Sequence, residues 1–219
     1  MKHTTLLFLF FILNMQAFSQ DNKYKDIIDQ LFIIDNDDQK YRVEIQDIET
    51  KYGLHSRQVD SLWTLLNKTD SINLLKVKAI LDKYGWLGIN DIGSQCNTTL
   101  FMVIQHADLK TQEHYLPLMR EAVKNKKARA GELALLEDRV ALRNSKEQIY
   151  GSQIGQDEKT LQYYVLPLLD PDNVDKRRAE VGLRPISEYL QHWDLKWDVE
   201  QYKKDLVDIK AKLKTMQTK

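Results

Sequence analysis

The stretch Thr98–Asp108 constrains the fold of this chain more than any other segment. At about 100° per residue, its apolar side chains point nearly all the way round a helix. A helix that is apolar on every side belongs in the middle of a domain. Its last residues include Gln105 and His106, two polar groups that need partners where the helix end is covered. We therefore expect the other elements to pack around this helix.

Composition indicates one mainly helical globular domain. The chain has 219 residues, 29% charged and 42% hydrophobic, with eight Gly and four Pro, so it is long enough for a sizeable core. Lys+Arg and Asp+Glu are equal at 32 each, and no basic patch contains interleaved aromatic residues. We therefore expect no nucleic-acid partner. The oligomeric state is left open.

The N-terminal residues have the features of an export signal. Residues 1–3 are basic, residues 6–13 are apolar, and Ala17-Phe18-Ser19 is a small-x-small cleavage site. We expect residues 1–19 to be a signal peptide and 20–219 a single mature domain. The alternative, a membrane anchor, is disfavoured because the apolar run is short for a bilayer span, and no later segment reaches that length. The single cysteine excludes an intramolecular disulfide. Export without disulfides suits a bacterial periplasmic or secreted protein.

Apolar spacing predicts one amphipathic helix over about 23–52, ended by Gly53. Asp38 occupies a position within its apolar seam, and Arg42 lies at the edge of the seam one turn later. An inward charge costs several kcal/mol unless it is paired. Two interpretations are open: an internal ion pair that fixes helix register, or two side chains that line a pocket.

Capping residues predict two further helices before the central one. Ser56 is expected to cap the first, and Asp70 or Ser71 the second, which Gly85 ends. After the central helix, Pro117 is expected in the first turn of a helix or at a kink.

The helix predicted over 129–143 turns one arginine inward. Arg139 projects within its apolar arc, and Asp138 lies at the border. Because neighbours one apart on a helix do not face each other, we expect the partner of Arg139 to come from elsewhere.

The C-terminal part is predicted to begin with a β-hairpin. Two short strands, 148–154 and 161–166, flank a polar loop. A short helix from Asn173 to Gly182 and a helical turn over 185–190 follow. An apolar stripe then predicts an amphipathic helix over 198–216, expected to pack against the first helix, with a dimer seam as the alternative.

No strong catalytic or metal-binding motif is present: there is no Gly-rich phosphate loop, paired-Cys zinc site, HExxH or GxSxG. We predict no cofactor and no metal. At the end of a buried helix, His106 fits a general base, although a hydrogen-bonded core histidine is the commoner outcome. Carboxylate pairs for glycoside hydrolysis are defined by spatial separation, and Asp38, Asp138 and Asp170 are the candidates.

Five short motifs occur in order: Asp38-Gln39-x-x-Arg42, Gly85-Trp86, Gln105-His106-Ala107-Asp108, Asp138-Arg139-Val140 and Gln148-x-Tyr150-Gly151-Ser152-Gln153, continued by Asp170, Arg178, Gly182-Leu183 and Tyr189. Together they resemble a bacterial family named only as a domain of unknown function, over about residues 38–190. The chain departs from the family pattern at Leu87, Glu137 and Ser152, where members often have Pro, Thr and Thr. The resemblance implies relatedness and no activity.

The inward polar residues lead to a pocket hypothesis. We expect them to converge beneath the hairpin on one polar pocket, suited to a small anionic or sugar-like ligand. The candidate catalytic residues are His106, Asp138 and Asp38, and the candidate ligand-binding residues are Arg42, Gln39, Gln105, Arg139, Tyr150 and Gln153.

Two functional hypotheses follow from different classes. The first is an exported enzyme, hydrolytic and acting on an envelope or glycan-type substrate, with His106 as base, Asp138 or Asp38 as orienter or acid, and arginines that hold substrate charge. The second is a non-catalytic helical binding or structural protein, whose polar cluster fixes register and whose terminal helices contact a partner. The first requires an open cavity, and the second a closed, fully paired network.

Overall fold

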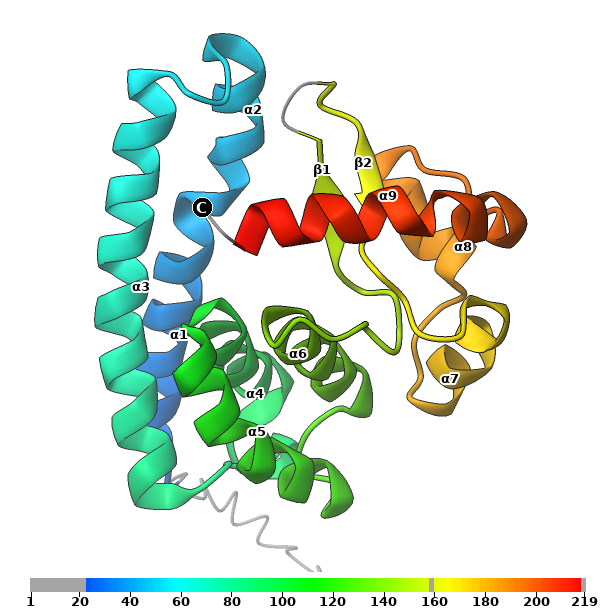
Figure 1. The fold of residues 1–219 in the computed structure, drawn as a ribbon. Coiled ribbons are helices and arrows are strands. Elements are labelled where there is room, and N and C mark those ends of the chain that lie inside the picture. Colours follow the sequence, from blue (N-terminus) through cyan, green and yellow to red (C-terminus); the bar gives the residue numbers. More distant parts are fainter. Residues whose placement is uncertain (1–22, 158–159, 218–219) are drawn as a thin grey trace, which may run out of the picture.

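The computed structural model describes residues 23–157 and 160–217, so the predicted signal peptide lies outside the described residues. The fold is mainly α, with one small antiparallel hairpin and a buried central helix, as predicted (Figure 1). The elements are α1 (Lys25–Lys40), α2 (Arg42–Tyr52), α3 (Arg57–Tyr84), α4 (Ile89–His106), α5 (Leu109–Lys124), α6 (Ala130–Arg143), β1 (Ile154–Gln156), β2 (Tyr163–Val165), η1 (Pro171–Asn173), α7 (Val174–Glu180), α8 (Ile186–Tyr189), η2 (Leu190–Trp193) and α9 (Val199–Gln217). No helix within these residues combines the length and apolarity needed to cross a bilayer.

Helix α4 lies at the centre of the larger core. Its side chains pack with those of α1, α3, α5 and α6, and the most deeply buried members of this cluster are Leu31, Ile34, Val77, Leu100, Ile104, Met119 and Leu136. Figure 1 shows α1 and α3 as long antiparallel helices along one side of this core. The prediction that an all-round apolar helix is central is confirmed.

The N-terminal helices begin and end at other residues than predicted. The helix expected over 23–52 is interrupted at Tyr41, which separates α1 from α2. The two helices expected before Gly85 are the single helix α3. Ser56 caps α3, as predicted, by accepting a hydrogen bond from a backbone N–H of the first turn at 3.3 Å. Asp70 is not a cap, because it lies inside α3 and its carboxylate binds Arg42.

Helix α5 begins earlier than the sequence pattern predicts. Asp108 caps it, accepting a hydrogen bond from the backbone N–H of Thr111 at 2.9 Å. Pro117 therefore lies inside α5 and not in its first turn.

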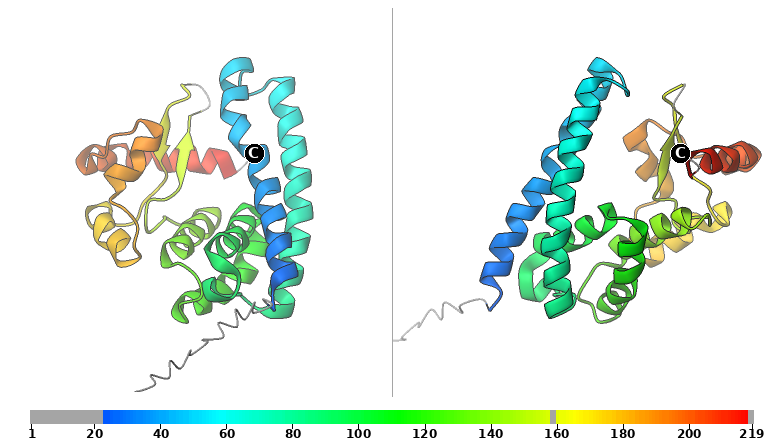
Figure 2. Two further views of the ribbon diagram at one scale, coloured as in Figure 1. Left: turned by 180° about the vertical axis from the view of Figure 1, so that it is seen from behind. Right: turned by 60° about the vertical axis from the view of Figure 1, so that its left-hand side comes forward.

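A second, smaller core holds the C-terminal elements. In the hairpin, Ile154 pairs with Val165, and a hairpin alone cannot bury its apolar face. Helix α9 runs beside it (Figures 1 and 2), and Tyr202 and Ile209 of α9 join a cluster that contains no residue of α1. The expectation that the α9 stripe packs against the first helix is therefore wrong, since the hairpin takes that stripe.

Apart from an isolated β-bridge between Gln148 and Leu168, the segment 148–153 is a loop around a buried carboxylate, where the sequence pattern predicted a strand. Asp138 on α6 is 0% exposed. It accepts hydrogen bonds from the backbone N–H groups of Ile149 at 2.6 Å, Tyr150 at 3.0 Å and Ser152 at 2.9 Å. Burial raises the pKa of the Asp138 carboxyl, and these N–H groups oppose that rise. Because these backbone N–H groups donate to Asp138, they cannot donate to a neighbouring strand, and strand β1 begins only at Ile154.

We expect Asp138→Asn to lower the free energy of unfolding by about 2 kcal/mol. The amide keeps the shape of the side chain but turns an NH2 group towards backbone donors. Urea denaturation measures the change, with Glu137→Gln as the control, because Glu137 pairs with Arg120 at the surface and such pairs contribute about 1 kcal/mol or less. Equal losses in the two variants would contradict the role given to Asp138.

Candidate functional site

The C-terminal end of α4 meets the last turn of α1 through a carboxylate and an imidazole. Oδ1 of Asp38 lies 3.0 Å from Nδ1 of His106. Oδ2 of Asp38 accepts a hydrogen bond from Nε2 of Gln39 at 2.7 Å. Asp38 is only 3% exposed, so both of its oxygens are held inside the protein. The structure thus brings together three residues that the sequence placed in one site.

Charge state sets the roles of the two imidazole nitrogens. Burial by itself raises the pKa of Asp38, but the hydrogen bond and charge of His106, together with Arg42, hold it below the ordinary value of 3.8. Asp38 is therefore ionised at neutral pH and only accepts hydrogen bonds. Nδ1 of His106 must then be the donor, and in the form of the ring that carries one proton Nε2 is the free acceptor.

Solvent reaches Nε2 of His106. The His106 side chain is 16% exposed. Within the described part of the chain, Nε2 has no hydrogen-bond partner, and it is not among the buried atoms that lack one. A pocket of about 250 Å³ lies beside the His106 side chain, lined by Asp38, Asn67, Asp70, Ser71, Leu74, Val103, His106, Ala107 and Asp108. An oriented imidazole at an open pocket is an arrangement that can accept a proton from a bound molecule.

Arg42 joins three helices next to this pair. It binds Asp70 of α3 with both terminal nitrogens, at 3.1 and 2.7 Å. Its Nη1 also donates to the backbone oxygen of Asp38 at 3.1 Å, and its Nη2 lies 3.9 Å from Oδ1 of that residue. The predicted Asp38–Arg42 ion pair exists, but the closer carboxylate is Asp70. Sequence reasoning missed this partner because 28 residues separate the two.

Two arginines of α6 bind carbonyl groups at the C-terminal end of α4. Nη1 of Arg139 donates to the carbonyl of Gln105 at 2.9 Å, and Nη1 of Arg143 donates to that of Ala107 at 2.7 Å. Nε of Arg139 donates to Oε1 of Gln153 at 2.9 Å. These cations occupy the carbonyls that a helix end leaves unpaired and lie at its negative end. The prediction that Arg139 pairs outside its own helix is confirmed, whereas Arg143 had no sequence pattern to mark it.

Asp138 on α6 and Tyr150 in the neighbouring loop do not line the pocket. Of the other predicted site residues, Asp38 and His106 line it, and Gln39, Arg42, Gln105, Arg139 and Gln153 do not. The Asp138 carboxylate is occupied by backbone N–H groups, and no hydrogen bond joins it to His106 within residues 23–157 and 160–217. The backbone oxygen of Tyr150 accepts a hydrogen bond from Arg178 at 2.7 Å. These residues hold the loop that presents Gln153 to Arg139.

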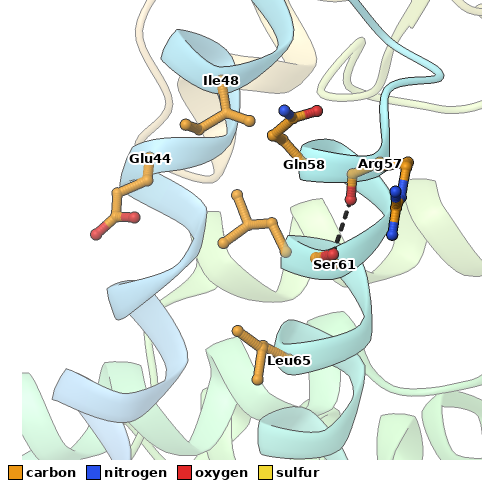
Figure 3. Close-up of a pocket in the computed structure, with 7 residues that line it drawn as sticks. Glu44, Ile48, Arg57, Gln58, Ser61 and Leu65 are labelled. Atoms are coloured by element: carbon orange, nitrogen blue, oxygen red, sulfur yellow. Dashed lines mark hydrogen bonds between the residues drawn. The ribbon is translucent and has the colours of Figure 1, made fainter. Parts of the chain in front are cut away.

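A larger groove between α2 and α3 has a different character. It has a volume of about 550 Å³ and is lined by Glu44, Ile48, Arg57, Gln58, Ser61, Leu62 and Leu65. Figure 3 shows Glu44 and Arg57 on opposite sides of it, and its one marked hydrogen bond joins Ser61 to the backbone of Arg57. No polar side chains converge there, so the pocket at His106 is the candidate site. No three His, Cys, Asp or Glu side chains are grouped to hold a metal ion anywhere in the part of the chain that the structure describes.

Comparison with known proteins gives a family match over most of the chain. A model described as a family of unknown function (DUF6624) matches residues 25–200, a range that contains every residue of the site. No curated protein and no solved structure matches the chain. The resemblance to a domain-of-unknown-function family is confirmed.

We expect Asp38→Asn to be less stable than the wild type near pH 7, and the difference to shrink as the pH falls below about 3.8. A carboxyl whose pKa is lowered by folding contributes stability that is present above its unfolded pKa. That stability is lost as the pH falls through the folded value. Urea denaturation at pH 7 and pH 3 measures both differences.

The control for this variant is Asp47→Asn, on the exposed surface of α2, which should stay within about 0.5 kcal/mol of the wild type. A difference between Asp38→Asn and the wild type that is constant or larger at pH 3 would contradict the ionised state assigned to Asp38.

Proposed function

Since the chain belongs to the DUF6624 family of unknown function, we propose a function from the geometry of its site. The protein is an exported hydrolase that uses His106 as a general base. The observation that carries the proposal is the His106 side chain, with Nδ1 held by the buried Asp38 carboxylate and Nε2 open to solvent beside a pocket. The features of residues 1–19 support a periplasmic or secreted location.

In this proposal the nucleophile is water. Nε2 of His106 takes a proton from water as the water oxygen attacks an acyl carbon, and the Asp38 carboxylate stabilises the imidazolium that forms. The bond to the leaving oxygen or nitrogen then breaks, and that atom takes the proton back from the imidazolium. Ser71 lines the same pocket, but its hydroxyl donates to the backbone oxygen of Asn67 at 2.8 Å, which favours water as the attacking group.

The positions of the three candidate carboxylates favour an acyl bond over a glycosidic bond. Asp38 is bound to His106, Asp138 to the 149–152 loop, and Asp170 to Asn173 and Arg177. Glycoside hydrolysis needs two carboxyl groups that flank one bond. We therefore propose an ester or amide bond of an envelope or glycan-type substrate as the target.

A second candidate function is non-catalytic partner binding through the N-terminal helices. It is favoured by the groove between α2 and α3, whose lining includes Ile48, Leu62 and Leu65 beside polar residues. Exposed apolar side chains on the terminal helix α1 also favour it, since Phe32 is 47% and Ile33 60% exposed. In this alternative the Asp38–His106 pair only joins α1 to α4.

We expect His106→Gln to lower kcat/KM by about 10²- to 10⁴-fold on substrates that the wild type hydrolyses. The panel is chromogenic esters, anilides and O-acetylated or N-acylated glycans, with released product followed over time. His114→Gln is the matched control, because His114 is an exposed histidine of α5. Equal activity of His106→Gln and the wild type would contradict the general-base role. A folded wild type that hydrolyses nothing in the panel would favour the second candidate.

A further inference from the structure

Among the described residues, no carboxylate forms an ion pair with Arg139. The Arg139 side chain is partly buried. The neighbouring charged groups include two more cations: burial, followed by the charges of Arg143 and Arg42, lowers the pKa of Arg139 to about 10. Arginine stays protonated there at neutral pH, so a positive charge is held in a partly buried, cationic neighbourhood.

The α4 helix end offsets only part of this charge. Arg139 and Arg143 lie four residues apart on α6, where like charges repel. Both donate to α4 carbonyls, and a helix terminus carries about half an elementary charge, which is less than two guanidinium charges. Asp108 acts favourably on Arg143, whereas the favourable contribution to Arg139 comes from the side chain of Tyr189 and not from a carboxylate of the described residues.

The geometry leaves donor groups unused on both guanidiniums. Arg139 uses Nε on Gln153 and Nη1 on Gln105. Its Nη2 has no partner within the described residues and is not among the buried unpaired atoms, so solvent reaches it. Arg143 is exposed and uses only Nη1. Guanidinium groups with unused N–H bonds, fixed by their other bonds, are well suited to an oxyanion.

We propose that Arg139, together with Arg143, binds an oxyanion group of the substrate, a carboxylate or a phosphate, on the α6 side of His106. That the anion belongs to a substrate rests on the proposed function, but binding of the anion can be measured without turnover. The carbonyls that the two arginines hold belong to Gln105 and Ala107, the residues on either side of His106. The two guanidiniums therefore lie at the same helix end as the proposed base, although neither arginine lines the pocket itself.

The acidic side chains of the pocket indicate that the anionic group of the substrate binds outside the pocket in which its acyl bond reacts. Asp38, Asp70 and Asp108 all line the pocket beside His106, so an oxyanion is repelled from it. The substrate class that fits both regions is an acidic molecule whose acyl bond is uncharged and lies apart from its carboxylate or phosphate.

The test is anion binding followed by melting temperature and isothermal titration calorimetry, at constant ionic strength set with NaCl. Inorganic phosphate and acetate are the two probes. We expect saturable stabilisation of the wild type by at least one of them. We expect Arg139→Gln to weaken that binding by about tenfold or more, as for the loss of a charge-assisted hydrogen bond, and Arg139→Lys to weaken it less.

Matched variants separate this inference from structural damage. Arg120→Gln on the surface of α5 should bind the anion as the wild type does, since Arg120 pairs only with Glu137 at the surface. If Arg139→Gln does not fold, Arg143→Gln replaces it, because an exposed side chain can be substituted without disturbing the core. We expect Arg143→Gln to lower the affinity for the anion at least about threefold. Unchanged affinity in the folded Arg139→Gln protein, or in Arg143→Gln, overturns the proposal.

Two further comparisons identify the anion and relate its binding to hydrolysis. Binding of phosphate alone assigns a phosphate group, binding of acetate alone a carboxylate, and binding of neither overturns the inference. The His106→Gln protein should still bind the anion. Binding there, with no hydrolysis by the wild type, keeps the anion site and contradicts the proposed hydrolase. Hydrolysis that requires His106 but shows no anion binding contradicts only the anion site.

Discussion

The structure depends on how the C-terminal end of a buried helix is provided with hydrogen-bond partners. The last carbonyls of α4 have no partners within their own helix, and they lie inside the domain. Gln112 of α5 donates to the carbonyl of Gln105 at 2.8 Å, and Arg139 and Arg143 of α6 supply the other donors. The same helix end carries His106, whose partner is on α1. The elements around α4 are thus joined at one polar point.

That point also connects the two apolar cores. Arg139 receives its second anchor from Gln153, which ends the loop wrapped around Asp138. Arg178, only 2% exposed, donates to the backbone oxygen of Tyr150 in that loop, and its guanidinium lies 4.8 Å from the centre of the Tyr189 ring. The C-terminal elements are therefore fastened to the helical part by polar contacts, so their position follows the position of the α4 end.

The polar cluster has a structural role and an unused chemical capacity at the same time. Asp38, Arg42 and Asp70 hold α1, α2 and α3 together, with both terminal nitrogens of Arg42 and both carboxylate oxygens of Asp38 bonded. His106 and Arg139 are different, because each uses part of its hydrogen-bonding capacity for structure and keeps one nitrogen open to solvent. A network that served only to fix helix register has no need of such open groups. This difference is the physical basis for placing a base and an anion site here.

Helical periodicity by itself determined that the stretch 98–108 is central and that Asp38, His106 and Arg139 face the interior, because the phase of a helix is a local property of the chain. It did not determine what those groups meet. His106 is 68 residues from Asp38, Arg139 is 34 from Gln105, and Arg42 is 28 from Asp70, so only the packing of whole helices brings them together. The loop at 148–153 shows the same limit, since a buried carboxylate on α6 competes for backbone donors that a strand pattern assigns to a sheet.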